Sequence, residues 1–435
     1  MHVAGKPRSA WRLGTEWEKL LVRRDSGAAL PFSGPGGIEV ILRELAERFA
    51  WNPSEENGRC VALQRGGASI TLEPGGQLEI SGAPFSTLHE TADELRTHAE
   101  ELLAVCQSHG VGVLGLGIQP RSTLEEIEWV PKPRYGIMGP YMLTVGTLGQ
   151  RMMKQTATVQ ANIDFADEAD AMLKFRVAQG IAPLVNAMFA NSCVVDGRLS
   201  GFKTFRGHIW TDTDSARCGF LRAAFDDDVG FADYVEWALD VPLYFILRKG
   251  RYRTDVTGMP FRRFLADGCE GERATMDDWN LHLTTLFPEV RLKAFLEIRS
   301  ADGQPLDRVL GLPALVKGIF YDADCLNAAW DMVKRLRYDD LSELSREVVR
   351  GALQARAGNV RVGEYAVELA AIADAGLRRL GQLDASQRDE RQYLDPLREH
   401  VEHGRTLADL TAEAWRDRWG TDVVKLVEAL ELRPN

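Results

Sequence analysis

The spacing of hydrophobic residues predicts a protein built from short strands and amphipathic helices. Residues 88–102 carry apolar side chains at helical spacing, and Thr87 with Glu90 forms a capping signature in front of them. Residues 111–118 and 156–165 alternate between apolar and polar positions, as half-buried strands do. Because strands and helices interleave without a regular β-α-β rhythm, the pattern favours an α+β fold over a doubly wound parallel sheet.

The residue pattern changes near residue 330. Residues 1–330 mix strand and helix patterns and predict one main domain. Residues 331–435 are dominated by Ala, Leu, Arg and Glu at helical spacing, which predicts a helical lobe packed on that domain. No low-complexity or Ser/Pro-rich linker marks the boundary.

Composition and charge exclude several classes of protein. The 435 residues are 45% hydrophobic and 26% charged, which is typical of a folded globular protein. Acidic residues outnumber Lys and Arg by 63 to 52, so the net charge of -11 offers no broad basic surface for nucleic acid or anionic lipid. No apolar run reaches the ~18 residues that span a bilayer, and the first residues lack a secretory signal. The six cysteines are far apart and lack metal-site spacing, which favours reduced thiols in a cytoplasmic protein.

Two conspicuous motifs do not predict a site. Gly110, Gly112 and Gly115 match GxGxxG, but they lie between a predicted helix and a predicted strand, whereas a dinucleotide fingerprint follows a strand and opens a helix. His208 and His282 have no partner at metal-ligand spacing, so both are interpreted as structural histidines.

Acidic residues at strand-like spacing are the first candidate chemistry. They are Glu16 and Glu18, two positions apart; Glu73 and Glu79, on either side of a Pro-Gly-Gly turn; and Glu297 with Arg299 in an apolar run. Residues two apart on a strand project from the same face, so several glutamates would face one another and repel. Hard divalent cations relieve such repulsion, and without Cys or His clusters the pattern favours Mg²⁺ or Mn²⁺. Mg²⁺ beside Arg is typical of phosphoryl transfer.

Each of these segments also has a purely structural interpretation. Glu16 and Glu18 could form the solvent face of an edge strand. The turn at Pro74 could be a plain hairpin connection, and Glu297 with Arg299 a cross-strand ion pair. The three segments together favour a site with several metal ions, and the absence of a Walker A motif favours a nucleotide-binding fold outside the P-loop class.

Longer motifs resemble one enzyme family. They are GTEWEK (14–19), LEPGGQLEISGAP (72–84), RYGIMGPYM (134–142), TVQANIDF (158–165), GHIWTDTD (207–214) and LHLTTLFPEVRLKAFLEIRSADG (281–303). In this order they resemble glutamate-cysteine ligase, also called γ-glutamylcysteine synthetase, in its plant and proteobacterial branch. The resemblance covers roughly residues 10–330 and thins in the helical tail.

The resemblance implies a fold similar to the catalytic domain of glutamine synthetase and the guanidino kinases: a curved, largely antiparallel sheet that forms a funnel surrounded by helices. It implies that residues 1–330 are a catalytic domain that joins the γ-carboxylate of L-glutamate to the amine of L-cysteine. This reaction uses ATP, passes through γ-glutamyl phosphate and begins glutathione biosynthesis. Roughly two or three Mg²⁺ ions, or Mn²⁺, would assist phosphoryl transfer. The partners would be these small molecules, with no nucleic acid or membrane, and the chain would act as a monomer or homodimer.

The resemblance also implies roles for individual residues. The metal ligands would be Glu16, Glu18, Glu73, Glu79 and Glu297, and Gln160 and Asn162 would lie on a strand that faces the metal ions and the nucleotide. Arg299 would face the ATP phosphates and Arg206 would hold a substrate carboxylate, so these two are the candidate catalytic residues. The amino-acid pocket would be lined by Thr158, Arg134, Tyr135, Tyr141 and Trp210.

Some positions depart from the family pattern. Trp17 stands where the family usually has His between the first two glutamates, and it is expected to point away from them. Plant relatives use cysteine pairs for redox control, but this chain has Gly5, Val256 and Leu310 at matching positions and retains only Cys269. A disulfide switch of the plant type is therefore not expected.

Two other functions fit part of the pattern. A related carboxylate-amine ligase would join glutamate to a different amine, and a non-catalytic homologue would only bind metal. Retention of all five glutamates together with Arg299 argues against the second. The base that deprotonates the incoming amine is not assigned, because a metal-bound Glu and a phosphate oxygen are both alternatives.

Overall fold

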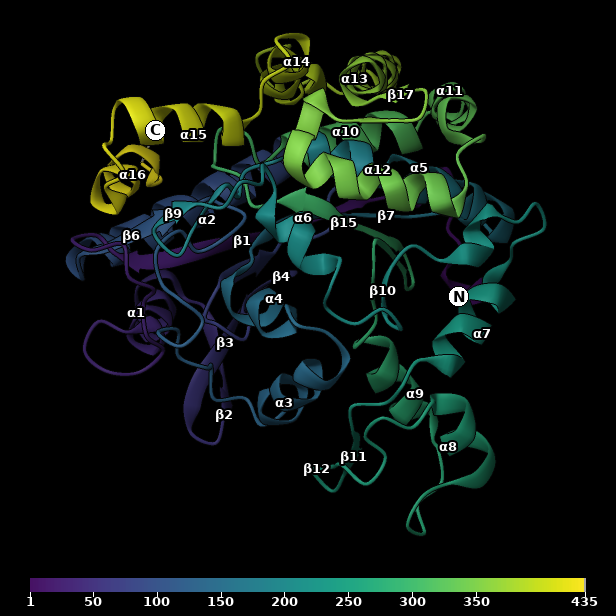
Figure 1. The fold of residues 1–435 in the computed structure, drawn as a ribbon, viewed down its shortest axis with the longest axis horizontal. Coiled ribbons are helices and arrows are strands. Elements are labelled where there is room, and N and C mark those ends of the chain that lie inside the picture. Colours follow the sequence, from purple (N-terminus) through teal and green to yellow (C-terminus); the bar gives the residue numbers. More distant parts are fainter. Residues whose placement is uncertain (434–435) are drawn as a thin grey trace.

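The computed structural model describes residues 1–433, and its centre is one antiparallel sheet of nine strands within those residues (Figure 1). In spatial order, eight of the strands are β14 (Val290–Leu292), β15 (Leu296–Asp302), β7 (Thr158–Ile163), β1 (Leu13–Arg23), β5 (Leu78–Ser81), β4 (Ala68–Leu72), β3 (Arg59–Arg65) and β2 (Asn52–Glu56). The ninth, β6 (Val111–Leu114), pairs with the second half of β1, beyond the end of β5. The order brings β1, β7 and β15, which are far apart in the chain, together at the centre.

The alternation of residues along β1 gives the sheet two different faces. Leu13, Trp17 and Leu21 are buried in the hydrophobic core. Glu16 and Glu18 are out of phase with them and project from the opposite face. Trp17 therefore points away from the glutamates, as predicted, and its Nε1 donates a hydrogen bond to a core backbone carbonyl at 2.9 Å.

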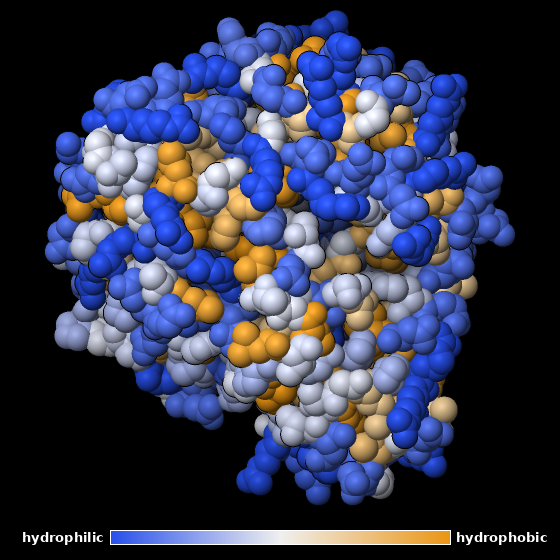
Figure 2. Space-filling model, viewed as in Figure 1, coloured by the Kyte–Doolittle hydropathy of each residue, from blue (hydrophilic) through white to orange (hydrophobic). Residues whose placement is uncertain are grey.

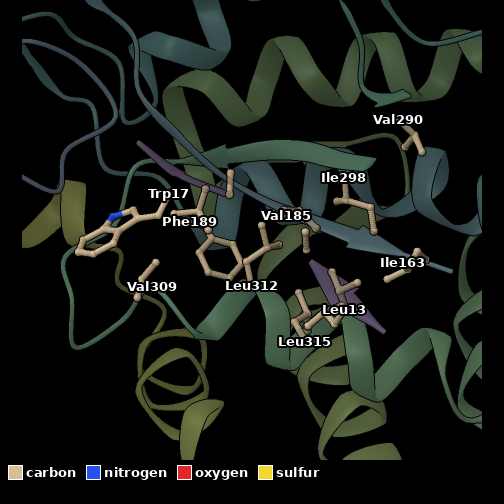
Figure 3. Close-up of a cluster of buried hydrophobic side chains, with 14 of the residues drawn as sticks. Leu13, Trp17, Ile163, Val185, Phe189, Val290, Ile298, Val309, Leu312 and Leu315 are labelled. Carbon is tan, nitrogen blue, oxygen red and sulfur yellow. The ribbon is translucent and has the colours of Figure 1, made fainter. Parts of the chain in front are cut away.

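Two helices cover the apolar face of the sheet. α5 (Glu168–Met188) packs on β15, and α10 (Gly311–Phe320) packs on β7. Each large aliphatic side chain buried in such a contact contributes about 1.5–3 kcal/mol. Figure 3 shows the contact, which includes Leu13, Trp17, Ile163 and Ile298 from the sheet and Val185, Phe189, Leu312 and Leu315 from the helical side.

The other helices before residue 330 surround the sheet. They are α1 (Ile38–Phe49), α2 (Leu88–Ser108), α3 (Tyr135–Val145), α4 (Gly149–Gln155), α6 (Phe205–Trp210), α7 (Phe231–Asp240), α8 (Phe261–Asp267) and α9 (Met276–Leu283). α2 begins with the predicted capping box, in which Thr87 accepts from the Glu90 backbone and Glu90 accepts from the Thr87 backbone. The predicted strand at 111–118 is shorter in the structure, where β6 ends at Leu114.

Short elements complete the part of the chain that the structure describes. Two-residue or three-residue strands pair as β8 (Val194–Val195) with β9 (Arg198–Leu199), β10 (Cys218–Gly219) with β13 (Phe287–Pro288), β11 (Ile246–Arg248) with β12 (Arg251–Arg253), and β16 (Arg356–Ala357) with β17 (Val360–Arg361). Short 3-10 helices are His2–Ala4, Arg8–Ala10, Arg222–Phe225, Ala352–Gln354 and Glu390–Tyr393.

The first four of the C-terminal helices lie on the same side of the sheet as α5 and α10 (Figure 1), and the last two pack against Leu20, Val22 and Leu114 at the β1–β6 end. The C-terminal helices are α11 (Ala323–Val333), α12 (Tyr338–Gly351), α13 (Val362–Leu380), α14 (Asp395–Glu402), α15 (Leu407–Asp417) and α16 (Val423–Leu430). α13 approaches α10 so closely that a Cβ on Gly376 would lie 1.9 Å from the carbonyl oxygen of Gly318. The largest cluster of buried hydrophobic residues contains side chains from Trp11 to Leu432, on both sides of residue 330. Residue 330 itself lies inside helix α11. The domain boundary expected at that residue therefore stays a prediction.

The molecular surface carries no continuous apolar face in the view of Figure 2, where hydrophobic residues form small groups among hydrophilic ones. Within residues 1–433, no helix combines the length and the apolar composition needed to cross a bilayer.

Candidate active site

The polar face of the sheet forms the floor of a cavity of about 330 Å³. Strands β1, β5, β7 and β15 supply the floor, and α3, α4 and α6 supply parts of the walls. Eleven of the residues predicted from the sequence line this cavity: Glu16, Glu18, Glu73, Glu79, Arg134, Tyr135, Thr158, Gln160, Arg206, Trp210 and Arg299. The fold therefore brings most of the predicted site residues to one place.

Glu18, Glu73 and Glu79 form an acidic cluster in the cavity. Glu18 lies directly opposite Glu79 in the β1–β5 register, and one carboxylate oxygen from each of the three glutamates lies within 4.8 Å of the others. Burial, followed by repulsion from neighbouring glutamates, raises the pKa of Glu18 well above its usual value and also raises the pKa of Glu79. A divalent cation would relieve this repulsion, so the donor set fits Mg²⁺ or Mn²⁺, which prefer carboxylate oxygen.

The turn that carries Glu73 is fixed by two glycines. Gly76 adopts a φ of +87°, which glycine tolerates and other residues rarely adopt. A Cβ on Gly75 would lie 2.1 Å from the carbonyl oxygen of Lys154, so only glycine allows α4 to approach the turn this closely. The Pro-Gly-Gly segment is therefore a positioning element for Glu73 as well as a connection between strands.

Glu297 is neutralised by three cations rather than exposed to the cavity. It is fully buried, and its oxygens accept from Arg291 at 2.6 and 2.8 Å, from Lys293 at 2.8 Å and from Arg299 at 2.7 Å. Burial would raise its pKa, but the three cations outweigh burial and hold the pKa well below its usual value. These contacts orient Arg299, and the role of Glu297 as a metal ligand stays a prediction.

Arg291 and Lys293 line the cavity but were not among the predicted site residues. Val290 and Leu292 are buried in the core, so alternation along β14 turns Arg291 and Lys293 toward the polar face. Apolar and basic residues alternate over positions 290–293, and this alternation could have identified Arg291 and Lys293 as residues of the polar face. Other cavity residues missing from the prediction are Pro74, Gln77, Ser81, Met138, Met152, Met153, Thr156, Phe245, Leu281, Thr284, Thr285 and Phe287.

Arg299 and Asn162 hold polar side chains in place across the centre of the sheet. Arg299 Nη1 donates to Gln160 Oε1 and to Glu297 Oε2, each at 2.7 Å, and within residues 1–433 its side chain makes no other hydrogen bond. Its Nε and Nη2 are therefore left for an oxyanion.

Asn162 lies beside the cavity lining, where its Nδ2 donates to Glu16 Oε1 at 2.9 Å. Burial and then repulsion from nearby glutamates raise the pKa of Glu16 to about 7.

Arg206 lies at the start of α6, which Thr204 caps. Its Nη2 donates to the Arg299 carbonyl at 2.8 Å and its Nη1 to the Ser300 carbonyl at 3.4 Å. Both carbonyls belong to an irregular stretch of β15 where the ladder with β7 changes register, so they are free to accept from a side chain. Burial lowers the pKa of Arg206, and nearby carboxylates, Asp302 first, oppose that change.

Thr158 and Tyr141 occupy different places. Thr158 lines the cavity, and its backbone N–H donates to Glu18 Oε2 at 2.9 Å. Tyr141 is outside the cavity lining found among residues 1–433, because its ring packs edge-on against Tyr244 at 5.1 Å and lies 5.6 Å from the guanidinium of Arg217. A contact between Tyr141 and a substrate stays a prediction.

The motifs that the sequence analysis set aside have structural roles. The GxGxxG match runs from the end of α2 through β6, and within the described residues no helix opens directly after Gly115. His282 Nε2 lies 2.8 Å from the Ala238 carbonyl, and the ring of His208 stacks on Phe202 at 4.2 Å. All six cysteines are free within residues 1–433.

The antiparallel sheet, its helical cover and the acidic cavity define the class expected from the sequence, the glutamine synthetase-like ligases. The model of glutamate-cysteine ligase family 2 matches residues 12–429, so the chain belongs to this family and is an enzyme of the ligase class. It is 40% identical over 428 residues to the chloroplastic glutamate-cysteine ligase of Brassica juncea, across 98% of this chain and 81% of that protein. The corresponding Arabidopsis thaliana enzyme is 41% identical over 428 residues, across 98% of this chain and 80% of that protein.

Solved structures share the fold. The glutamate-cysteine ligase of Francisella tularensis, determined in complex with AMP, aligns with a TM-score of 0.57 at 13% identity, over 97% of this chain and 87% of that chain. A bifunctional glutathione synthetase from Pasteurella multocida aligns with a TM-score of 0.50 at 11% identity, over 96% of this chain and 52% of that chain. The predicted fold class is thereby confirmed.

The predicted cytoplasmic location is contradicted by these comparisons. The relatives from Brassica juncea, Medicago truncatula, Arabidopsis thaliana and Oryza sativa are all named as chloroplastic enzymes. The prediction was wrong because cysteine spacing reports on the redox conditions around a protein and does not distinguish one reducing compartment from another.

Proposed function

We propose that this chain catalyses the ATP-dependent joining of the γ-carboxylate of L-glutamate to the amine of L-cysteine, the first step of glutathione biosynthesis. Membership of glutamate-cysteine ligase family 2 over residues 12–429 carries the proposal. The cavity supports it, because an acidic cluster beside buried arginines can bind both a metal-complexed nucleotide and the carboxylates of amino acids.

Glu18, Glu73 and Glu79 would hold a divalent cation, Mg²⁺ or Mn²⁺, with Glu16 and Glu297 as further expected ligands. When bound, such a cation shields the negative charges of ATP and the glutamate carboxylate from each other. The raised pKa values of Glu18 and Glu79, caused by burial and mutual repulsion, support a cation at this cluster.

Arg299 would bind the transferring phosphoryl group through Nε and Nη2, while Gln160 and Glu297 fix its Nη1. Arg206 would bind a substrate carboxylate. Phosphoryl transfer from ATP turns the poorly electrophilic γ-carboxylate into γ-glutamyl phosphate. The amine of cysteine then attacks the acyl carbon and phosphate leaves. No protein nucleophile is required, so the residues contribute by orienting the reactants and stabilising charge.

The test is an ADP-release assay with purified protein, ATP, Mg²⁺ and glutamate, in which cysteine is compared with other amino acids as the amine. The expected result is cysteine-dependent ADP release with γ-glutamylcysteine identified by mass spectrometry. Equal turnover with an unrelated amino acid would overturn the cysteine assignment.

A matched pair of variants tests the acidic cluster. Glu73→Gln removes one charge from the cluster and is expected to lower kcat/KM on the order of 100-fold while the protein stays folded. Glu364→Gln removes a charge from an exposed site on α13, where Glu364 pairs with Arg361 at 3.0 Å, and is expected to retain full activity. Equal activity of both variants would refute the metal role of the cluster.

A further inference from the structure

A buried lysine lies beside the turn that carries Glu73. The side chain of Lys132 belongs to a residue that is 8% exposed, and its Nζ donates to the carbonyl of Leu72 at 3.1 Å. Within residues 1–433 it forms no ion pair with a carboxylate, unlike the buried Lys174, which pairs with Asp170 at 2.9 Å. Removing an ammonium group from water is costly unless a carboxylate compensates it, so a lysine at this position indicates a role beyond packing.

The carbonyl of Leu72 accepts hydrogen bonds from two side chains. Tyr135 Oη donates to it at 3.1 Å, the same distance as Lys132 Nζ. The ladder between β3 and β4 ends at Thr71, so this carbonyl lies beyond the backbone pairing on that side. Because the peptide bond is planar, the two donors that fix this carbonyl also fix the Cα of the next residue, Glu73.

The segment that supplies these donors is itself restrained. Pro131 and Pro133 flank Lys132, and each proline ring fixes a φ angle. The backbone N–H of Val130 donates to the carbonyl of Pro74, inside the turn, at 2.9 Å. The segment therefore holds the turn at two backbone carbonyls, one directly before the glutamate and one directly after it.

The charge of Lys132 opposes the binding of a cation. Burial first, and then Arg134, lowers the pKa of Lys132, and Glu73 opposes this change more than any other carboxylate. The ammonium group therefore lies within electrostatic reach of the acidic cluster, where it repels a divalent cation. The position and the charge of Lys132 thus have opposite effects on metal binding, so an experiment can separate them.

We propose that Lys132 is a positioning residue for the acidic cluster. By holding the Leu72 carbonyl together with Tyr135, it keeps the Glu73 carboxylate within reach of a cation bound by the cluster. The gain in metal affinity from the fixed backbone exceeds the loss caused by the positive charge. This inference rests on the metal role of the cluster in the proposed function.

The decisive variant is Lys132→Met, which keeps a side chain of similar length and removes the donor and the charge. The probe is Mn²⁺, titrated into the metal-free full chain and followed by the electron paramagnetic resonance of the free ion. We expect the Kd for Mn²⁺ to rise about 10-fold, as when a group that holds a metal ligand in place is removed. A charge effect alone would lower the Kd, and a purely structural role would lower the Tm without changing the Kd. An equal or lower Kd would overturn the proposal.

Two further variants locate the effect. Tyr135→Phe removes the second donor to the same carbonyl without a change of charge, and its Kd for Mn²⁺ should rise roughly 3- to 10-fold. Lys174→Met is the matched control, because Lys174 is also buried and donates to a backbone carbonyl, that of Asp164, at 2.9 Å, but is outside the cavity lining found among residues 1–433. It should leave the Kd within about twofold. An unchanged Kd in Tyr135→Phe, or an equal rise in Lys174→Met, would overturn the proposal.

Hydrogen exchange separates this inference from the proposed function. The backbone amides of Glu73 and Gly76 donate within the turn, at 3.0 and 2.9 Å. In mass spectrometry of peptides that cover residues 72–77, they should exchange roughly 5-fold faster in Lys132→Met than in the wild-type protein, while peptides from α5 stay unchanged. Equal exchange in the turn would overturn the proposal.

The outcomes for the wild-type protein are distinct from these. If it bound no Mn²⁺, the metal role of the cluster would fail, and if it bound Mn²⁺ but made no γ-glutamylcysteine, the ligase assignment would fail. In both cases the exchange rates of residues 72–77 would still decide whether Lys132 holds the turn.

Discussion

Replacing Glu16 by Gln is expected to stabilise the metal-free protein at high pH. Burial first, and then repulsion from Glu297 and Glu79, raises the pKa of Glu16 from 4.5 to about 7. An acid with a higher pKa in the folded state binds its proton more tightly when folded. Its contribution to stability is therefore present below pH 4.5 and is lost as the pH rises to about 7.

The size of the effect follows from the shift. One pKa unit corresponds to about 1.36 kcal/mol, so a shift from 4.5 to about 7 corresponds to about 3 kcal/mol. Glu16 is partly exposed, and screening by solvent gives an expected range of about 1–3 kcal/mol. For 435 residues the entropy of unfolding is about 0.9 kcal/mol/K, so the expected change in Tm is about 1–3 °C. Gln can still accept the hydrogen bond that Asn162 donates.

The assay is thermal unfolding of the wild-type protein and Glu16→Gln at pH 5 and pH 8 in the presence of a chelator. We expect nearly equal Tm values at pH 5, where Glu16 is protonated, and a higher Tm for the variant at pH 8. Adding Mg²⁺ at pH 8 should raise the wild-type Tm more than that of the variant, because a charged ligand then gains a partner. A difference between the two proteins that is the same at both pH values would refute the reasoning.

Three further predictions concern stability and redox state. Arg291→Met removes the bidentate partner of the fully buried Glu297 and should lower the free energy of unfolding, measured by urea titration, by about 3 kcal/mol. A loss below about 1 kcal/mol would show that Lys293 and Arg299 are enough to neutralise Glu297. Gly376→Ala places a Cβ 1.9 Å from the Gly318 carbonyl and should destabilise the packing of α13 on α10 by about 1–3 kcal/mol, whereas an unchanged Tm would contradict that close contact. All six cysteines are free in the described residues, so migration on non-reducing gels should not respond to dithiothreitol, and a redox-dependent band would argue for a disulfide.

Local sequence patterns correctly predicted the parts of the fold that depend on neighbouring residues. The capping box at Thr87 formed as predicted, and alternation along β1 separated Trp17 from Glu16 and Glu18. The short strand β6 ended earlier than predicted, because the pattern of alternation does not report where a strand loses its pairing partner.

The candidate site was predictable where several motifs shared one chemistry. Eleven of the residues predicted from the sequence meet in the cavity. Carboxylates at strand spacing pointed to the four glutamates and Arg299 among them, and the resemblance to the family implied the other six. Contacts between strands were not predictable. The ion pair between Glu297 and Arg299 was one interpretation of the sequence, but nothing in the sequence around Glu297 says that Arg291 and Lys293 also bind its oxygens. Nothing around Tyr141 says that its ring packs against Tyr244.

The sequence by itself determined the two faces of the central strands and the acidic residues of the site, because periodicity and residue chemistry are local properties. The class of the protein followed from the order of its long motifs and their resemblance to one family. Only the tertiary structure decided which charges pair. Burial and the register of β1, β5, β7, β14 and β15 left Glu18, Glu73 and Glu79 facing one another and neutralised Glu297 with three cations. Charge compensation depends on distances between residues far apart in the chain, and those distances exist only once the sheet has formed.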